Sequence, residues 1–228
     1  MQGRKAFRLA LTLVLSTGVL AMAKASTPQL QPNGPQWCAL PANIAAALCA
    51  EGIDASQYLR LLRGDLITQS RPVPAGKSGV HVAIIGVVHA SVRSVWDEIE
   101  NCGKSPPIMP TLESCEILKP NSPLPPNRRL ELLKIRFHLF FFSINTTLIN
   151  EETMEAPNYL GWKQVRGEAK INEGYFRIIS VGPKTQIVVY DTLVDPGPLV
   201  PGFVKTWVVE NTLPDVIRAL RHHAGKKA

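Results

Sequence analysis

The sequence predicts an α+β fold in which an antiparallel sheet of about seven strands curves around a long C-terminal helix. From Val80 onward, strand-length runs rich in β-branched and aromatic residues follow one another with short turn signals between them. One helical pattern interrupts them after the first strand, and one long helical pattern follows the last. A twisted sheet with one apolar face needs a cover, and the final helix is long enough to provide it.

The first 25 residues have the pattern of a secretory signal peptide and are set aside before the fold is considered. A basic start, "GRKAFR", precedes the apolar run Leu9–Ala23, which ends in small residues. The run is shorter than the roughly 20 apolar residues of a membrane-spanning helix. Cleavage after Ala23 or Ala25 fits this pattern, and an uncleaved anchor is the alternative. We expect a periplasmic or secreted protein with no integral membrane segment in its mature chain, and transient contact with a membrane surface is compatible with this.

The number and distribution of charged residues do not indicate a nucleic-acid-binding surface. The whole chain has 25 Lys+Arg and 18 Asp+Glu, but removing the predicted leader leaves 21 basic residues against 18 acidic ones, a net charge of +3. A nucleic-acid surface gathers Lys and Arg on one face with aromatic residues between them, whereas here only the tail "RALRHHAGKKA" is locally basic. Such a tail is typical of a solvated helix end, so we predict no nucleic-acid partner.

Four cysteines in a chain expected to be exported predict disulfides. The local pairings Cys38–Cys49 and Cys102–Cys115 are favoured among the three arrangements, because each closes a short loop that contains turn residues. Zinc binding is the weaker interpretation, since the usual ligand spacing is missing. We expect neither a metal nor a cofactor, because the sequence has no Gly-rich phosphate loop and no nucleophile motif.

Residues 26–79 predict an N-terminal extension that packs on a main domain formed by residues 80–228. The segments "PANIAAALCAEG" and "ASQYLRLLRGD" have the pattern of two short helices, with Pro41 suited to a helix start and Gly64 to a helix end. Residues 71–79, "RPVPAGKSG", indicate a loop or linker. Roughly 50 residues with few large apolar groups bury too little surface to fold alone.

The main domain begins with "HVAIIGVVHA", a strand apolar on both faces and therefore expected to be covered on both. In the helix that follows, apolar residues fall at i, i+3, i+4 and i+7, with Ser91 as the candidate N-cap. Gly103 and the prolines of "PPIMP" end it. Further strands are predicted near 113–118, 128–139, 141–153, 159–167, 173–181 and 185–194. A helix over 203–223 follows, with a kink or restart near Pro214.

The order of these elements resembles the helix-grip superfamily. The resemblance is carried by "HASVRSVWDEIENCGKSPPIMP" after the first strand, "YLGWKQVRGEAKINEGYFRI" in the meander, "TQIVVYDTLVDPGPLVPGF" before the last helix and "NTLPDVIRALRHHA" within it. That superfamily, also called START or SRPBCC, includes lipid-transfer domains, polyketide cyclases and coenzyme-Q-binding proteins. The resemblance covers about Val80 to His223. It implies a sheet that wraps the last helix and leaves a cavity between them, with the proline-rich segment at its mouth.

Seven residues are candidates for lining this cavity. On the last helix Phe203 and Trp207 belong to an apolar stripe, and Asn211 in its middle either binds a ligand head group or bonds backbone near Pro214. Period-two alternation places Arg166 on the face of Trp162, where its guanidinium would suit a carboxylate or phosphate. A salt bridge to Glu168 or Glu173 is the alternative. The remaining candidates, each with core packing as its alternative, are Phe137 and Tyr190.

The leading functional hypothesis is periplasmic binding or transport of a hydrophobic small molecule such as a lipid, an isoprenoid quinone or a polyketide-like ring system. Phe137, Trp162, Phe203 and Trp207 would form the wall, and Arg166, Tyr190 and Asn211 would orient a polar end. The alternative is a cyclase or dehydratase that uses the same cavity, with His89, Tyr190, Asp191 and Arg166 as acid–base candidates. A third hypothesis is an interaction protein whose cavity is filled by side chains.

Overall fold

The computed structural model describes residues 40–102, 108–109, 111–139, 142–197 and 212–226. Its centre is a single antiparallel sheet of eight strands in the order β1-β2-β8-β7-β6-β5-β4-β3. Short connections join the consecutive strands from β3 to β8. The strands are β1 (Ile67–Ser70), β2 (Val80–Val88), β3 (Leu112–Leu118), β4 (Arg128–Leu139), β5 (Phe142–Glu155), β6 (Tyr159–Gly167), β7 (Ile171–Gly182) and β8 (Thr185–Asp195).

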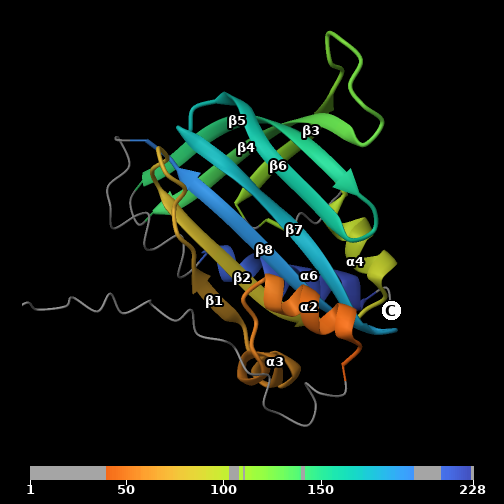
Figure 1. The fold of residues 1–228 in the computed structure, drawn as a ribbon. Coiled ribbons are helices and arrows are strands. Elements are labelled where there is room, and N and C mark those ends of the chain that lie inside the picture. The colour runs from red at the N-terminus through yellow and green to blue at the C-terminus, as the bar shows by residue number, and fades with distance from the viewer. Residues whose placement is uncertain (1–39, 103–107, 110, 140–141, 198–211, 227–228) are drawn as a thin grey trace, which may run out of the picture. The chain divides into compact units, whose positions relative to one another are not determined.

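Helices cover the two faces of the sheet. They are α2 (Ala42–Ala50), α3 (Ala55–Leu62), α4 (Val92–Ile99) and α6 (Leu213–Gly225). Figure 1 shows α2 in front of the sheet and α6 behind it. The α+β helix-grip fold class predicted from the sequence is therefore confirmed. No helix among these described elements is long and apolar enough to span a membrane.

Strand β2 is buried on both faces, as its uninterrupted apolar sequence predicts. Its even-numbered residues contact α4 and α6, and we call this side of the sheet the inner face. Its odd-numbered residues contact α2 and α3, on what we call the outer face. Each apolar side chain buried here contributes about 1.5–3 kcal/mol relative to an exposed one. The inner residues of β2 are Val82, Ile84 and Val88, and the outer ones are Ala83, Ile85 and Val87.

Helix α6 approaches β2 closely because β2 carries a glycine at the contact. A Cβ atom at Gly86 would lie 2.6 Å from Cγ2 of Ile217, so any larger residue would push the helix away. Ile217 and Leu220 are fully buried, and Arg221 Nε donates to the carbonyl oxygen of Val87 at 2.8 Å. The helix begins at Leu213, where the sequence predicts a kink or restart. Residues 203–211 of the predicted helix lie outside the described residues.

The N-terminal extension packs on the outer face, away from α6. Leu48, Ile53 and Leu61 are fully buried against β2, β7 and β8. At the end of α2, the carboxylate of Glu51 accepts a hydrogen bond from the Tyr175 hydroxyl at 2.8 Å and forms an ion pair with Arg177 Nε at 2.7 Å. These contacts tie residues 40–79 to the strands of the main domain.

The extension also contributes a strand that the sequence pattern does not reveal. Ile67–Ser70 pairs with β2, with Ile67 opposite Ile85, and raises the predicted seven strands to eight. Four residues are too few to display an alternating pattern, and pairing with the edge of β2 provides the missing hydrogen bonds. The predicted loop over residues 71–79 follows it.

Candidate functional site

A cavity of about 440 Å³ lies on the inner face of the sheet, between strands β3–β8 and the segment that begins with α4. Ile99, Ile108 and Met109 line it from the α4 side. Half of the lining residues on the sheet side are aliphatic or aromatic, and they provide a surface for an apolar ligand. The sheet residues of this apolar wall are Leu112, Leu133, Ile135, Leu160, Trp162, Phe176 and Tyr190.

Three aromatic rings form one continuous part of this wall. The Trp162 ring stacks on Tyr190 with centroids 5.6 Å apart and an interplanar angle of 22°, and Phe176 lies 4.8 Å from Tyr190. Gly174 makes room for the indole, because a Cβ atom there would lie 2.6 Å from Cζ2 of Trp162. Burial raises the pKa of Tyr190 to about 12, so its phenol stays protonated at physiological pH.

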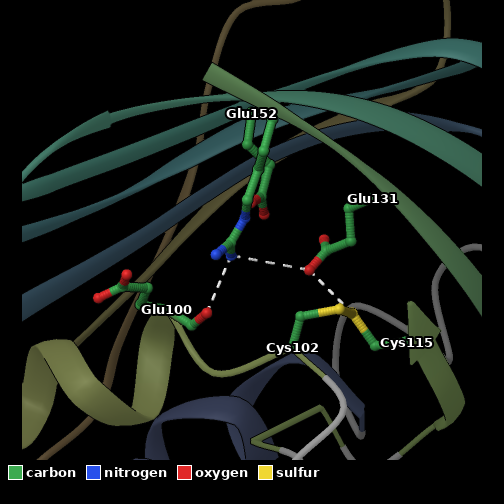
Figure 2. Close-up of a disulfide and its surroundings, with 6 residues drawn as sticks. Glu100, Cys102, Cys115, Glu131 and Glu152 are labelled. Atoms are coloured by element: carbon green, nitrogen blue, oxygen red, sulfur yellow. Dashed lines mark hydrogen bonds and ion pairs between the residues drawn. A yellow bond between two sulfur atoms is a disulfide. The ribbon is translucent and has the colours of Figure 1, made fainter. Parts of the chain in front are cut away.

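A buried ionic group forms the polar end of the cavity (Figure 2). Arg129 on β4 lies opposite Glu152 on β5, and its Nε donates to Glu152 Oε2. Arg129 Nη2 donates to the carbonyl oxygen of Glu100 at 2.9 Å and lies 3.9 Å from Glu131 Oε1. Glu131 and Glu152 are 7% and 4% exposed, so one guanidinium serves two nearly buried carboxyl groups.

Glu131 keeps its proton at neutral pH. Burial is the largest cause, the neighbouring Glu152 adds to it, and the opposing effect of Arg129 is smaller, so the pKa of Glu131 rises to about 8. The cavity wall therefore carries a carboxylic acid beside a carboxyl group that is bound to an arginine. Such pairs can hold a polar ligand group or transfer a proton.

This proton should be visible in the pH dependence of stability. The folded-state pKa of Glu131 lies above its unfolded value, so the stability that its protonation contributes is complete below about pH 4.5 and is lost as the pH rises through about 8. In Glu131→Gln this pH-dependent loss of stability should disappear. It should persist in the control Glu151→Gln, which removes the carboxylate next to Glu152 on β5, where Glu151 pairs with Arg128 near the surface. Urea unfolding across this pH range measures the difference, and parallel curves for wild type and Glu131→Gln would contradict it.

Next to this group, two asparagine amides line the cavity. Asn150 lies directly opposite Glu131 in the β4–β5 register and is 2% exposed. Its Oδ1 accepts a hydrogen bond from Asn172 Nδ2 at 3.2 Å. Amide and carboxyl groups thus occupy adjacent positions on the inner face, at one side of the apolar wall.

A disulfide closes the cavity wall beside Glu131. Cys102, which follows α4, is bonded to Cys115 on β3 with their Cα atoms 5.3 Å apart, which is one of the two pairings predicted from the sequence. Figure 2 shows the bond next to Glu131, whose Oε1 lies 2.8 Å from Cys115 Sγ. It connects the end of α4 to an edge strand of the sheet.

The other predicted disulfide is not formed. Cys49 is a free, exposed thiol close to the end of α2, so the structure differs here from the predicted Cys38–Cys49 bond. Cys38 itself lies outside the described residues. Loop length and turn residues alone cannot establish a disulfide, because the bond also requires a specific separation and orientation of the two Cβ atoms.

Of the predicted cavity residues, the structure brings Trp162 and Tyr190 together and places Arg166 elsewhere. Arg166 is exposed, because a register shift in the β5–β6 pairing sets Gln164 opposite Asn150 but Arg166 opposite Ile149. Val165, which is 55% exposed, is the extra residue that ends the strict alternation. Phe203, Trp207, Asn211 and the side chain of Phe137 lie outside the described part of the chain.

Two further acid–base candidates from the sequence also lie away from the cavity. His89 is exposed at the end of β2. Asp191 points to the outer face, where its Oδ1 lies 2.8 Å from His81 Nε2 and its Oδ2 lies 3.4 Å from Arg71 Nε. Tyr190 and Asp191 are adjacent on β8, so their side chains point to opposite faces of the sheet.

The sequence interpretation missed Glu131, Glu152 and Asn150, although a signal for the first was present. Glu131 shares its parity with Leu133 and Ile135, which are buried on the inner face. A glutamate in that position is an exception to hydrophobic alternation, and such exceptions often mark a functional group. The partners of Glu131 come from β5 and could not be identified without the strand register.

Residues 88–221 match the family described as "Polyketide cyclase / dehydrase and lipid transport", which covers more than half of the chain. The chain belongs to this family. No curated protein sequence matches the chain significantly. The polyketide cyclase and lipid transport family lies within the START/SRPBCC superfamily, so the resemblance found in the sequence is confirmed.

Solved START structures share the fold of this family member at low sequence identity. A START superfamily protein from Mycobacterium smegmatis is 20% identical with a TM-score of 0.53, and the match covers 65% of this chain and 99% of that one. A STAR-related lipid transfer protein from Xanthomonas axonopodis is 16% identical with a TM-score of 0.56, and the match covers 70% of this chain and 93% of that one. Human StAR-related lipid transfer protein 5 is 13% identical with a TM-score of 0.53, and the match covers 82% of this chain and 97% of that one.

Proposed function

We propose that this START-superfamily protein binds and carries a hydrophobic small molecule, such as a lipid, an isoprenoid quinone or a polyketide-like ring system, in the periplasm. The observation that carries the proposal is a cavity of about 440 Å³ with an apolar, aromatic wall and one polar end. The lipid-transfer proteins among the solved structures share the fold and support a ligand of this kind. The predicted signal peptide supports export.

The size and composition of the cavity suit a small amphiphile. Small-molecule sites commonly measure roughly 300–1,000 Å³, and their affinity comes mainly from apolar burial at ~25 cal/mol per Å². A ligand that buries about 200 Å² of apolar surface would therefore gain on the order of 5 kcal/mol before entropic costs. The ring cluster of Trp162, Phe176 and Tyr190 offers flat surfaces for such contact.

Truncating the aromatic wall should weaken ligand binding. We expect Trp162→Ala to reduce affinity for the uncharged fluorescent probe Nile red by about tenfold, because the indole contributes a large contact surface. Val165→Ala, at an exposed position of the same strand, is the control and should bind as wild type does. Circular dichroism confirms folding of both variants, and equal affinity in Trp162→Ala would contradict the proposed site.

Location and natural ligand can be tested in one preparation. We expect the full chain, expressed in a bacterial host, to appear in the periplasmic fraction with a mature N-terminus at Lys24 or Ser26. Mass spectrometry of organic extracts should then detect an apolar compound bound to the protein in near-stoichiometric amount. Retention of the uncleaved chain in the membrane would contradict periplasmic carriage. Extracts without such a compound, together with no Nile red binding, would contradict the ligand-binding function.

The carboxyl pair favours one second candidate, a cyclase or dehydratase. Glu131 in its protonated form lies in the cavity wall beside Glu152, and together they could supply an acid and a base for loss of water from a β-hydroxy ketone. Here Glu131→Gln should abolish turnover while leaving Nile red affinity unchanged. A carrier would show no turnover in either form.

A further inference from the structure

The ionisable side chains among the described residues that line the cavity are acidic. Among the described residues that line it, four are glutamates and none is Lys, Arg or His. Arg129 lies behind this lining with its guanidinium engaged by Glu152 and by the carbonyl oxygen of Glu100. Glu113 at the β3 edge is paired with Arg136 Nη1 at 2.9 Å. A ligand carboxylate or phosphate entering this cavity would find no cation among the described residues that line it.

The polar end instead offers an amide donor. Asn150 is 2% exposed and lines the cavity. Its Oδ1 accepts from Asn172 Nδ2, so the N–H groups of its own Nδ2 are what this side chain can offer to an occupant of the cavity. Buried amide donors are normally paired, and a ligand oxygen in the cavity would be a suitable acceptor.

A second donor lies directly across the β4–β5 ladder. Residues opposite each other in an antiparallel pair have Cβ atoms about 4.5–5.5 Å apart, which places the Glu131 carboxyl beside the Asn150 amide. Three groups lie next to this carboxyl: Glu152 from β5, Arg129 from β4 and the Cys115 sulfur from β3. Glu98 from α4 lines the same cavity. In these surroundings Glu131 holds its proton at neutral pH and can donate it to an acceptor.

We infer that the cavity selects uncharged amphiphiles whose polar end is a carbonyl or hydroxyl oxygen, and that this oxygen accepts hydrogen bonds from Asn150 and Glu131. The inference rests on the proposed function and names its ligand class. Ketones, quinones and long-chain alcohols belong to this class. Fatty acids and phospholipids do not, because their anionic groups find no cation in the described lining.

Three competitors with similar alkyl chains separate the ligand classes. Nile red bound to the full-length protein is displaced with methyl nonyl ketone, decanoate or decyltrimethylammonium, each below its micelle concentration. At pH 7 the ketone should displace the probe at about tenfold lower concentration than either ion, a difference that one hydrogen bond can supply. If decanoate or the ammonium compound competes as well as the ketone, the inference is wrong although the cavity binds apolar molecules. If Nile red itself does not bind, the proposed function fails.

Variants test the two donors separately. Asn150→Leu should lose about tenfold in ketone affinity, because the amide donor is removed together with the Oδ1 that accepts from Asn172. Its affinity for diphenylhexatriene, a hydrocarbon probe without a hydrogen-bond acceptor, should equal that of the wild type. Glu131→Gln keeps a donor without a titrating proton, so its ketone affinity at pH 9 should equal that at pH 7. The wild type should lose affinity over that interval, which spans the pKa of about 8 at Glu131. Glu151→Gln is the matched control and should behave as wild type does.

Each result decides one part of the inference. Unchanged ketone affinity in folded Asn150→Leu would remove Asn150 from the binding site. Should that variant fail to fold, the wild-type comparison between pH 7 and pH 9 still decides the role of Glu131. Ketone affinity that is equal at the two pH values would overturn it, and affinity for decyltrimethylammonium that rises with pH would show a cation site instead.

Discussion

Replacing Arg129 with methionine is expected to lower the free energy of unfolding by about 3–5 kcal/mol near neutral pH, because the change leaves two buried carboxyl groups without a positive neighbour. Arg129 is 18% exposed in its side chain, and it holds Glu152 as well as the end of α4 through the carbonyl oxygen of Glu100. Methionine keeps much of the side-chain volume, so the loss reports on charge and hydrogen bonding more than on packing. Urea unfolding followed by circular dichroism measures it.

The neighbouring residue provides the control. Arg128 makes an ion pair with Glu151 in which the side chains are 46% and 28% exposed, so Arg128→Met should cost less than about 1 kcal/mol. Equal stability losses for the two variants would show that the Arg129 group is not a buried ionic pair.

Removing the disulfide should produce the second large effect. The Cys102–Cys115 bond spans 13 residues, and cross-links of that length stabilise a fold by about 3 kcal/mol through restriction of the unfolded chain. We expect the double variant Cys102→Ser/Cys115→Ser to lose about that amount. The same change should also speed release of a bound ligand, because both cysteines line the cavity and hold its α4 side to β3. Stopped-flow dilution of bound Nile red measures release.

Cys49→Ser controls for the loss of a sulfur. Cys49 is exposed and free, so its replacement should change stability by no more than about 0.5 kcal/mol. Chemical reduction of the wild type should reproduce the behaviour of the double variant. Unchanged stability and release in both cases would mean that the bond restrains neither the unfolded chain nor the cavity wall.

Much of the fold follows from local sequence patterns. The strands from β3 to β8 were predicted within a few residues because each is long, carries β-branched or aromatic residues and is bounded by turn signals. The Ser91 cap of α4 is also observed, with Ser91 Oγ accepting from Ser94 N at 3.1 Å. Strand β1 was missed because its four residues depend on pairing with β2 for their structure.

The candidate site was harder to predict because it depends on register. Alternation correctly assigned Trp162 and failed at Arg166, where one bulged residue moves every later side chain to the opposite face. The Glu131 pair was missed for a related reason. The chemical surroundings of Glu131 are set by Glu152 and Asn150 on the neighbouring strand, and the sequence of one strand does not reveal which residues lie opposite it.

Because α2 and α3 lie on the outer face, changes in stability and changes in ligand specificity can arise at different residues. The buried residues of these helices, such as Leu48 and Leu61, contact β2, β7 and β8 from the side opposite the cavity. Substitutions there can raise or lower the stability of the scaffold without altering a residue that lines the cavity. Specificity can therefore diverge through β4 and β5 while thermal tolerance adapts independently through the extension.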